Sequence, residues 1–120
     1  MSALNSQALA HSVRIDRVAR SRVQEVDFTN VAFSSVFSDH MFISQFRNGK
    51  WDDGVIRPFG DITVSPSISA LHYGISVFDG MKAHRSPTGN PLLFRPADNA
   101  RRFQRSAARL AMATVPESLF

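Results

Sequence analysis

The sequence has 120 residues, of which 43% are hydrophobic and 10% aromatic, a composition typical of one globular domain and not of a disordered chain. It contains no cysteine, which excludes disulfides and thiolate metal sites, and no apolar run reaches the roughly 18 residues that a membrane-spanning helix needs. The net charge of +4 comes from arginine, because twelve arginines stand against two lysines, and arginine suits bidentate contacts to carboxylates and phosphates.

Residues 1–30 are predicted to form a poorly ordered or helical amino-terminal extension, because their apolar positions follow a helical period only loosely. The first 23 residues are rich in Arg and Ser and contain one acid, Asp16, as mitochondrial transit peptides do. They lack the apolar segment of a secretory signal. We therefore expect a cytoplasmic protein, with a mitochondrial location as the alternative.

Residues 31–120 are predicted to form one small α+β domain. The Asn48-Gly49 pair lies between Met41–Phe46 and Lys50-Trp51, which is a strong hairpin signal. The piece Val55–Pro58 is expected at a sheet edge, because proline cannot donate to a strand ladder. Asp61–Val64 is a further extended segment.

A short helix is expected over Ser69–Phe78, with Ser69 as its cap and Gly80 as its end, because apolar residues recur at helical spacing. The turn-forming residues 86–91 then separate Met81–His84 from Leu92–Phe94, which predicts a second hairpin.

A longer helix is predicted over Ala97–Met112, with Pro96 at its start and Asp98 or Asn99 as a cap. Val115-Pro116 is expected to end it. The element order predicts an α+β fold with a small antiparallel or mixed sheet, a short helix and one longer C-terminal helix.

The faces of this longer helix can be assigned at 100° per residue. A buried stripe is expected at Ala100, Phe103, Ala107, Leu110 and Ala111. Arg101 and Arg105 fall near the opposite side and are expected in solvent. Arg102 and Arg109 fall on the shoulder of the stripe, from which a guanidinium can point into a neighbouring cleft.

Four motifs occur in order along the chain: SDHM at 38–41, LHYG at 71–74, VFDGMKAHR at 77–85 and RRFQRSAARL at 101–110. In this combination the chain, from about Phe33 to its end, resembles the amino-terminal part of branched-chain amino-acid aminotransferases. These are enzymes of fold type IV that use pyridoxal 5'-phosphate.

The resemblance implies a small amino-terminal domain that closes over one side of the cofactor, in a homodimer whose active site is shared with a large domain. It implies that Arg102 contacts the cofactor phosphate and that Phe33, Tyr73 and Phe78 line the substrate pocket. The implied substrates are branched-chain amino acids and 2-oxo acids, including 2-oxoglutarate. Asp79 stands where the family usually has Glu, and we expect it at a structural position.

The resemblance also implies that the catalytic lysine of the family is absent from this chain. Transamination in this family needs a lysine that forms a Schiff base with the cofactor, and neither Lys50 nor Lys82 matches its position. We therefore predict that this chain alone has no catalytic residue and does not catalyse transamination. An isolated small domain would also expose a phenylalanine-rich surface and self-associate.

Three other interpretations remain. The chain can be a catalytically inactive binding module derived from the same domain, or part of another fold-type-IV enzyme, a D-amino-acid aminotransferase or an aminodeoxychorismate lyase; SDHM and LHYG favour the branched-chain group. A nucleic-acid binder is the weakest alternative, because the arginines are scattered and no aromatic stacking platform accompanies them. The four histidines have no metal-ligand spacing, and His40 and His72 are expected to be hydrogen-bonded structural residues.

Overall fold

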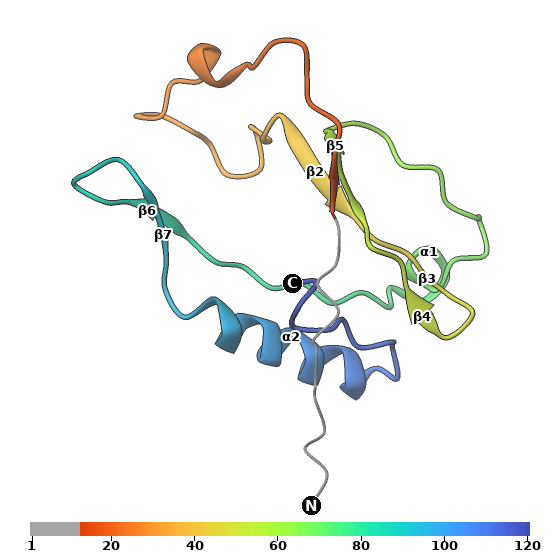
Figure 1. Cartoon of the computed structure of the whole chain (residues 1–120). Helices are drawn as coiled ribbons and strands as arrows, with labels where there is room; N and C mark the ends of the chain where they lie inside the picture. The colour runs from red at the N-terminus through yellow and green to blue at the C-terminus, as the bar shows by residue number, and fades with distance from the viewer. Residues whose placement is uncertain (1–12) are drawn as a thin grey trace, which may run out of the picture. The chain divides into compact units, whose positions relative to one another are not determined.

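The computed structural model describes residues 13–120, which divide into two compact units, residues 13–63 and 64–120. The strands of both units are two to four residues long. The longest helix, in the second unit, has 14 residues (Figure 1). The fold class predicted from the sequence, α+β with small antiparallel and mixed sheets, is confirmed.

The first unit is built on a three-stranded sheet with the order β1-β5-β2. Strand β1 (Arg14–Ile15) runs parallel to β5 (Val55–Pro58), and β2 (His40–Ile43) runs antiparallel to it. The prediction that Val55–Pro58 is an edge piece is wrong, because β5 is the middle strand. Pro58 is tolerated there because it is the last residue of β5, beyond the two residues with which β1 pairs.

The hairpin predicted at Asn48-Gly49 is confirmed. Strands β3 (Phe46–Arg47) and β4 (Lys50–Trp51) pair antiparallel, and the rings of Phe46 and Trp51 lie 5.4 Å apart. Asn48 and Gly49 both have positive φ, 52° and 79°. This is the conformation of the tight two-residue turn that matches strand twist.

Part of the segment 1–30 is described, and it forms β1 and a 3-10 helix, η1 (Val23–Glu25). Residues of the SDHM motif form hydrogen bonds with residues 18–22 of this segment. The carboxylate of Asp39 accepts hydrogen bonds from the Ser21 hydroxyl at 2.6 Å and the Arg22 backbone N–H at 3.1 Å, and Nε2 of His40 accepts the Val18 N–H at 3.1 Å. His40 is therefore a hydrogen-bonded structural residue, as expected. The boundary at residue 30 stays a prediction, and residues 1–12 lie outside the described chain.

The second unit begins with a single helical turn, α1 (Ser69–Tyr73). The predicted extent to Phe78 is wrong, because Gly74 takes a left-handed conformation with φ 63° and ends the helix six residues before Gly80. Ser69 makes no side-chain cap, since Ile68 occupies the N-cap position. Residues 61–64 form no strand.

The second predicted hairpin is confirmed, with β6 (Ala83–Arg85) antiparallel to β7 (Pro91–Leu93). Helix α2 (Pro96–Arg109) follows directly. It starts at Pro96, as predicted, but without a side-chain cap. Its N-cap residue is Arg95, and Asp98 instead forms ion pairs with Arg95 and Arg101.

The buried stripe of α2 is shorter than predicted. Ala100 and Ala107 are buried and Phe103 is half-buried, whereas Leu110 is exposed, because the helix ends at Arg109 and not at Met112. The carboxyl-terminal segment folds back on this face. Leu119 is buried, the ring of Phe120 lies 5.9 Å from that of Phe103, and Gln104 donates to the backbone carbonyl of Val115 at 2.8 Å.

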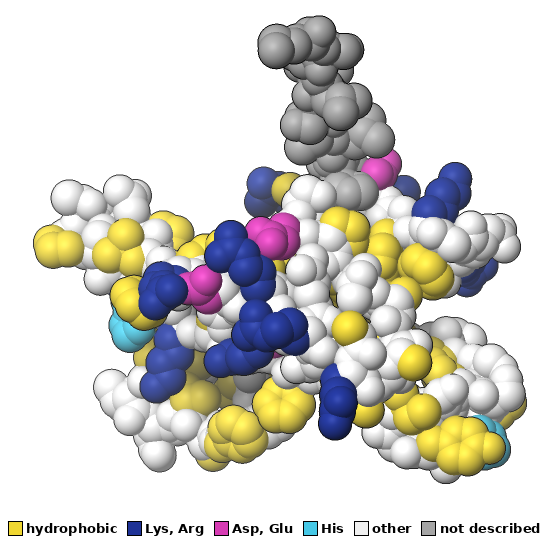
Figure 2. Space-filling view, turned by 90° about the horizontal axis from the view of Figure 1, so that it is seen from below, with side chains coloured by type: hydrophobic (Ala, Val, Ile, Leu, Met, Phe, Trp, Pro, Cys, Tyr) yellow, Lys and Arg dark blue, Asp and Glu magenta, His cyan; other side chains and the backbone are white. Residues whose placement is uncertain are grey.

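Large apolar side chains remain at the surface of both units, as the yellow side chains of Figure 2 show. The residues above 70% exposure are Phe28, Phe33, Tyr73, Phe78 and Phe94. No helix within residues 13–120 is long and apolar enough to span a membrane.

Candidate functional site

The centre of the candidate site is a carboxylate that three side-chain donors hold. Asp79 lies between α1 and β6, and its side chain is only 4% exposed. Arg102 of α2 donates from Nε to Oδ2 at 2.7 Å and from Nη2 to Oδ1 at 2.8 Å. Asn99 donates from Nδ2 to Oδ1 at 2.7 Å. Such a bidentate arginine–carboxylate pair has a defined geometry as well as a favourable charge.

The position of these groups follows from the helix period. Asn99 and Arg102 are three residues apart on α2 and therefore project from the same side of the helix. Asn99 also donates to the carbonyl of Gly80 at 3.1 Å. The segment before β6 is thus fixed to α2 through both a side chain and a backbone carbonyl.

The contacts change the acidity of the carboxyl group. The hydrogen bond from Arg102, followed by that from Asn99, lowers the pKa of Asp79 from 3.8 to about 2. The same pair raises the pKa of Arg102 above its usual value. Asp79 is therefore ionised throughout the neutral range, and it serves as a fixed anion for Arg102.

The ion pair with Asp79 uses only part of the hydrogen-bonding capacity of Arg102. Its side chain is 57% exposed, and among residues 13–120 no acceptor contacts its Nη1 atom. A guanidinium carries five N–H donors, so Arg102 retains donors for an additional anion. Arg102 and Arg109 were both predicted on the helix shoulder, able to point into a neighbouring cleft; Arg102 contacts the segment before β6 through Asp79.

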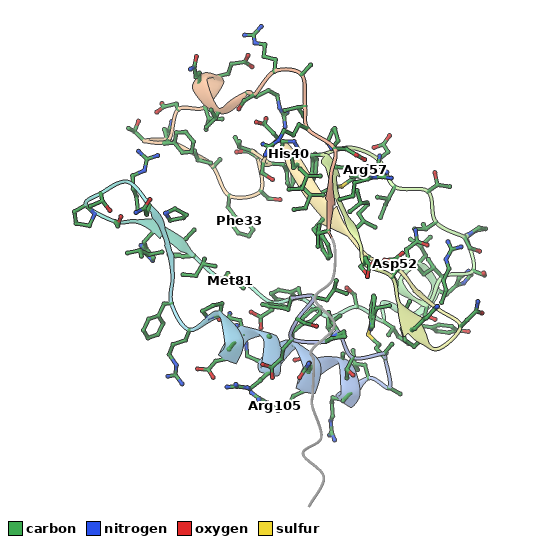
Figure 3. All side chains as sticks on the ribbon, in the orientation of Figure 1. Phe33, His40, Asp52, Arg57, Met81 and Arg105 are labelled. Carbon is green, nitrogen blue, oxygen red and sulfur yellow. The ribbon has the colours of Figure 1, made fainter. Side chains whose placement is uncertain are left out.

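The other arginines of α2 differ from Arg102. Arg101 pairs with Asp98 and with Glu117, both at the surface. Arg105, which Figure 3 labels on α2, is exposed and forms no ion pair with any described residue, and the same is true of Arg109. Arg102 is thus the arginine of α2 whose partner, Asp79, is nearly buried.

The structure places the three predicted pocket aromatics at the surface. Phe78 is 93% exposed and directly precedes the nearly buried Asp79. Tyr73, at the end of α1, is 80% exposed, and Phe33 projects from a loop of the first unit (Figure 3). Within residues 13–120, neither Phe33 nor Phe78 is packed in a core.

Sequence reasoning missed the role of two residues. The sequence predicts Asp98 or Asn99 as a helix cap, and it predicts Asp79 only at a structural position with no named partner. The available signal was the i, i+3 spacing of Asn99 and Arg102, which puts an amide and a guanidinium on one helix face.

Neither lysine lies at this cluster. Lys50 begins β4 in the first unit, and Lys82 is an exposed residue next to β6. Within the described chain no group of three or more His, Asp or Glu side chains is placed to hold a metal ion.

Comparison with known proteins identifies relatives of the chain, although no protein-family model matches it. The branched-chain-amino-acid aminotransferases of Haemophilus influenzae and Helicobacter pylori are each 41% identical to it over 98 residues, which is 82% of this chain and 29% of the relative. That of Mycolicibacterium smegmatis is 36% identical over 119 residues, 98% of this chain and 32% of the relative.

The chain spans about a third or less of the length of these curated relatives. Identity at this level over most of the chain exceeds what a shared fold class alone would give. Over most of its length the chain is therefore similar to the amino-terminal part of the branched-chain-amino-acid aminotransferases.

Proposed function

We propose that this chain supplies the amino-terminal part of a pyridoxal-phosphate-dependent aminotransferase that transfers amino groups between branched-chain amino acids and 2-oxo acids such as 2-oxoglutarate. The observation that carries the proposal is the arrangement at Asp79. The half-exposed Arg102 is fixed by the nearly buried carboxylate of Asp79, and Asp79 directly follows the exposed Phe78 in the sequence. The names of the relatives support the reaction class.

The residues present fit an anionic cofactor group. Arg102 is the proposed contact to the phosphate of pyridoxal 5'-phosphate, because it offers unused donors at an exposed edge of its guanidinium. When bound, the cofactor supplies the electron sink that transamination requires. Arg102 binds and orients; it neither gives nor takes a proton at neutral pH.

Phe33, Tyr73 and Phe78 are the proposed aromatic surfaces for the substrate side chain. Their exposure leaves them available for contact with a branched aliphatic group, and each methylene group so buried contributes about 0.8 kcal/mol. The hydroxyl of Tyr73 adds one directional hydrogen bond.

We also propose that the protein acts in the cytoplasm and as a homodimer; the exposed aromatics support association. The 120-residue chain alone is proposed to be inactive, since neither Lys50 nor Lys82 matches the family's cofactor lysine. Incubation with pyridoxal 5'-phosphate, leucine and 2-oxoglutarate should give no glutamate. Turnover together with a borohydride-reducible adduct on a single lysine would contradict this.

The proposed function is tested in a chimera. The 98 matched residues of this chain replace their counterparts in the Haemophilus influenzae relative, and leucine-dependent glutamate formation is measured. We expect turnover within roughly an order of magnitude of the relative, because the matched segments are 41% identical. A chimera that melts cooperatively and binds the cofactor, yet converts a D-amino acid and not leucine, would favour the other fold-type-IV enzymes.

A further inference from the structure

The proposed function gives Arg102 a role, but it does not explain why several side-chain donors hold the carboxylate of Asp79. The two carboxylate oxygens accept three side-chain hydrogen bonds of 2.7 to 2.8 Å, two of them on Oδ1. The three donors come from α2, whereas the acceptor comes from the segment before β6. No other carboxylate of the described chain combines this number of side-chain donors with so little exposure.

The guanidinium atoms that contact Asp79 determine which donors of Arg102 remain available. Asp79 engages Nε and Nη2, which is one edge of the planar group. Two hydrogen bonds to this edge fix the direction in which the edge faces. Both N–H bonds of Nη1 and the second N–H of Nη2 are then directed away from Asp79.

We propose that Asp79 is a positioning residue for Arg102, holding the guanidinium by its Nε–Nη2 edge so that its Nη1 side is presented to a phosphate-type anion. Asn99 supports the arrangement by fixing the carboxylate and the carbonyl of Gly80 to the same helix. This inference rests on the proposed function for the identity of the anion, but not for the orientation of the guanidinium.

Two physical consequences follow. The pair has no net charge, so the contribution of Arg102 to anion binding is directional hydrogen bonding more than long-range attraction. Because Asp79 is nearly buried, its own charge is shielded from an incoming anion by the guanidinium that covers it. Arg105, which forms no ion pair within residues 13–120, would instead lose side-chain entropy when it binds an anion.

The contacts between Asp79 and Arg102 link the proposed phosphate contact of Arg102 to the proposed substrate contact of Phe78. Phe78 and Asp79 are adjacent, so the carboxylate that orients Arg102 also fixes the backbone that carries the exposed Phe78 ring. A loss of the Asp79 contact is therefore expected to affect the position of both groups.

The experiment is nuclear magnetic resonance of the full 120-residue chain labelled with ¹⁵N and ¹³C, with the Arg102 Nε–H signal assigned from Arg102→Lys. In the wild type we expect a scalar coupling across the hydrogen bond between Arg102 Nε and the Asp79 carboxyl carbon, and slow exchange of that proton. Asp79→Asn should accelerate the exchange about tenfold, and Asp79→Glu, which retains the carboxylate, should restore most of the protection.

Asp98→Asn is the matched control, because Asp98 pairs with Arg95 and Arg101 on the same helix at the surface. It should leave the Arg102 signal unchanged. Absence of the coupling in the wild type, or an Arg102 signal that does not respond to Asp79→Asn, would overturn the proposal. The coupling is read in the wild type, so the test holds even if Asp79→Asn does not fold.

The anion is examined with pyridoxine 5'-phosphate, which lacks the aldehyde that would react with lysines, alongside pyridoxine and inorganic phosphate. A shift of the Arg102 Nη signals by both phosphates, but not by pyridoxine, that is weakened in Asp79→Asn supports the positioning role toward phosphate. A coupling that depends on Asp79, with no response to either phosphate, would support the orientation by Asp79 and contradict the phosphate contact of the proposed function.

Discussion

The Nε atom of Arg102 lies 2.7 Å from Oδ2 of Asp79, and the two residues are 23 positions apart in the sequence. This contact joins the segment before β6 to α2 inside the second unit. It gives a structural reason for the acid next to Gly80, and it distinguishes Arg102 from the other arginines of the same helix.

The contact predicts how stability depends on pH. The pKa of Asp79 is about 2 in the folded chain, against 3.8 without the contacts. Between these values the unfolded chain binds more protons, so the stability from this group is complete above about pH 4 and declines as the pH falls toward 2. In urea unfolding, Asp79→Asn should lower the midpoint at pH 6, and its difference from the wild type should shrink toward pH 2.

Asp98→Asn provides the comparison, since it removes an equal charge from an exposed ion pair on α2 and should change the midpoint little. A midpoint difference for Asp79→Asn that stays constant from pH 6 to about pH 2 would contradict the assignment.

Gly54 is predicted to tolerate no side chain. Its φ is +72°, and an added Cβ would lie 2.5 Å from two ring carbons of Phe42 and 3.0 Å from the Ile43 carbonyl oxygen. Gly54→Ala should therefore lower the free energy of unfolding by about 1–3 kcal/mol. Gly60→Ala is the control, because nothing lies within 4 Å of its Cβ position. Equal effects of the two substitutions would show that the contact with Phe42 is not restrictive.

Asp39 is predicted to hold the segment around residue 22. The hydroxyl of Ser21 and the backbone N–H of Arg22 lower the pKa of its carboxyl group. Asp39→Ala should accelerate hydrogen exchange of the Arg22 amide by about tenfold. The amide of Asp16, which donates to Ile56 at 2.8 Å in the sheet, serves as an internal reference. Unchanged exchange at Arg22 would mean that the carboxylate does not hold this segment.

Much of the fold could be predicted from local signals. The Asn48-Gly49 turn needs two positive φ angles that this dipeptide adopts at low cost, so its hairpin follows from the sequence. The start of α2 at Pro96 has a similar local cause. The end of α1 was misplaced because two glycines, Gly74 and Gly80, were equally able to end it, and only tertiary structure decides between them.

The candidate site was less accessible to sequence reasoning. Helical periodicity separated Arg102 and Arg109 from the other two arginines of α2, and the family resemblance then singled out Arg102, but neither signal carries information about a partner 23 residues away. The central position of β5 was likewise missed, because the parallel strand β1 comes from a segment that showed no strand pattern. Long-range pairings depend on chain topology and not on local residue patterns.

Self-association is predicted from the exposed aromatic residues. Phe78 is almost fully exposed and Phe94 largely so, and exposed apolar surface of this kind favours contact with another copy. Light scattering of the chain should show a mass that rises with concentration. Phe78→Ser with Phe94→Ser should shift the distribution toward monomer, whereas Thr88→Ser, in the turn between β6 and β7, should not. A wild type that stays monomeric at high concentration would contradict the prediction.

The most direct test of the central claim compares two arginines of one helix in the chimera with the Haemophilus influenzae relative. The measurement is the dissociation constant of pyridoxal 5'-phosphate for Arg102→Gln and for Arg105→Gln, each against the parent. The account predicts that Arg102→Gln weakens cofactor binding roughly tenfold or more, since it removes charge-assisted hydrogen bonds to phosphate, and that Arg105→Gln changes it less than about twofold. Equal dissociation constants for the two variants would contradict the claim that Arg102, held by Asp79, is the phosphate contact of this chain.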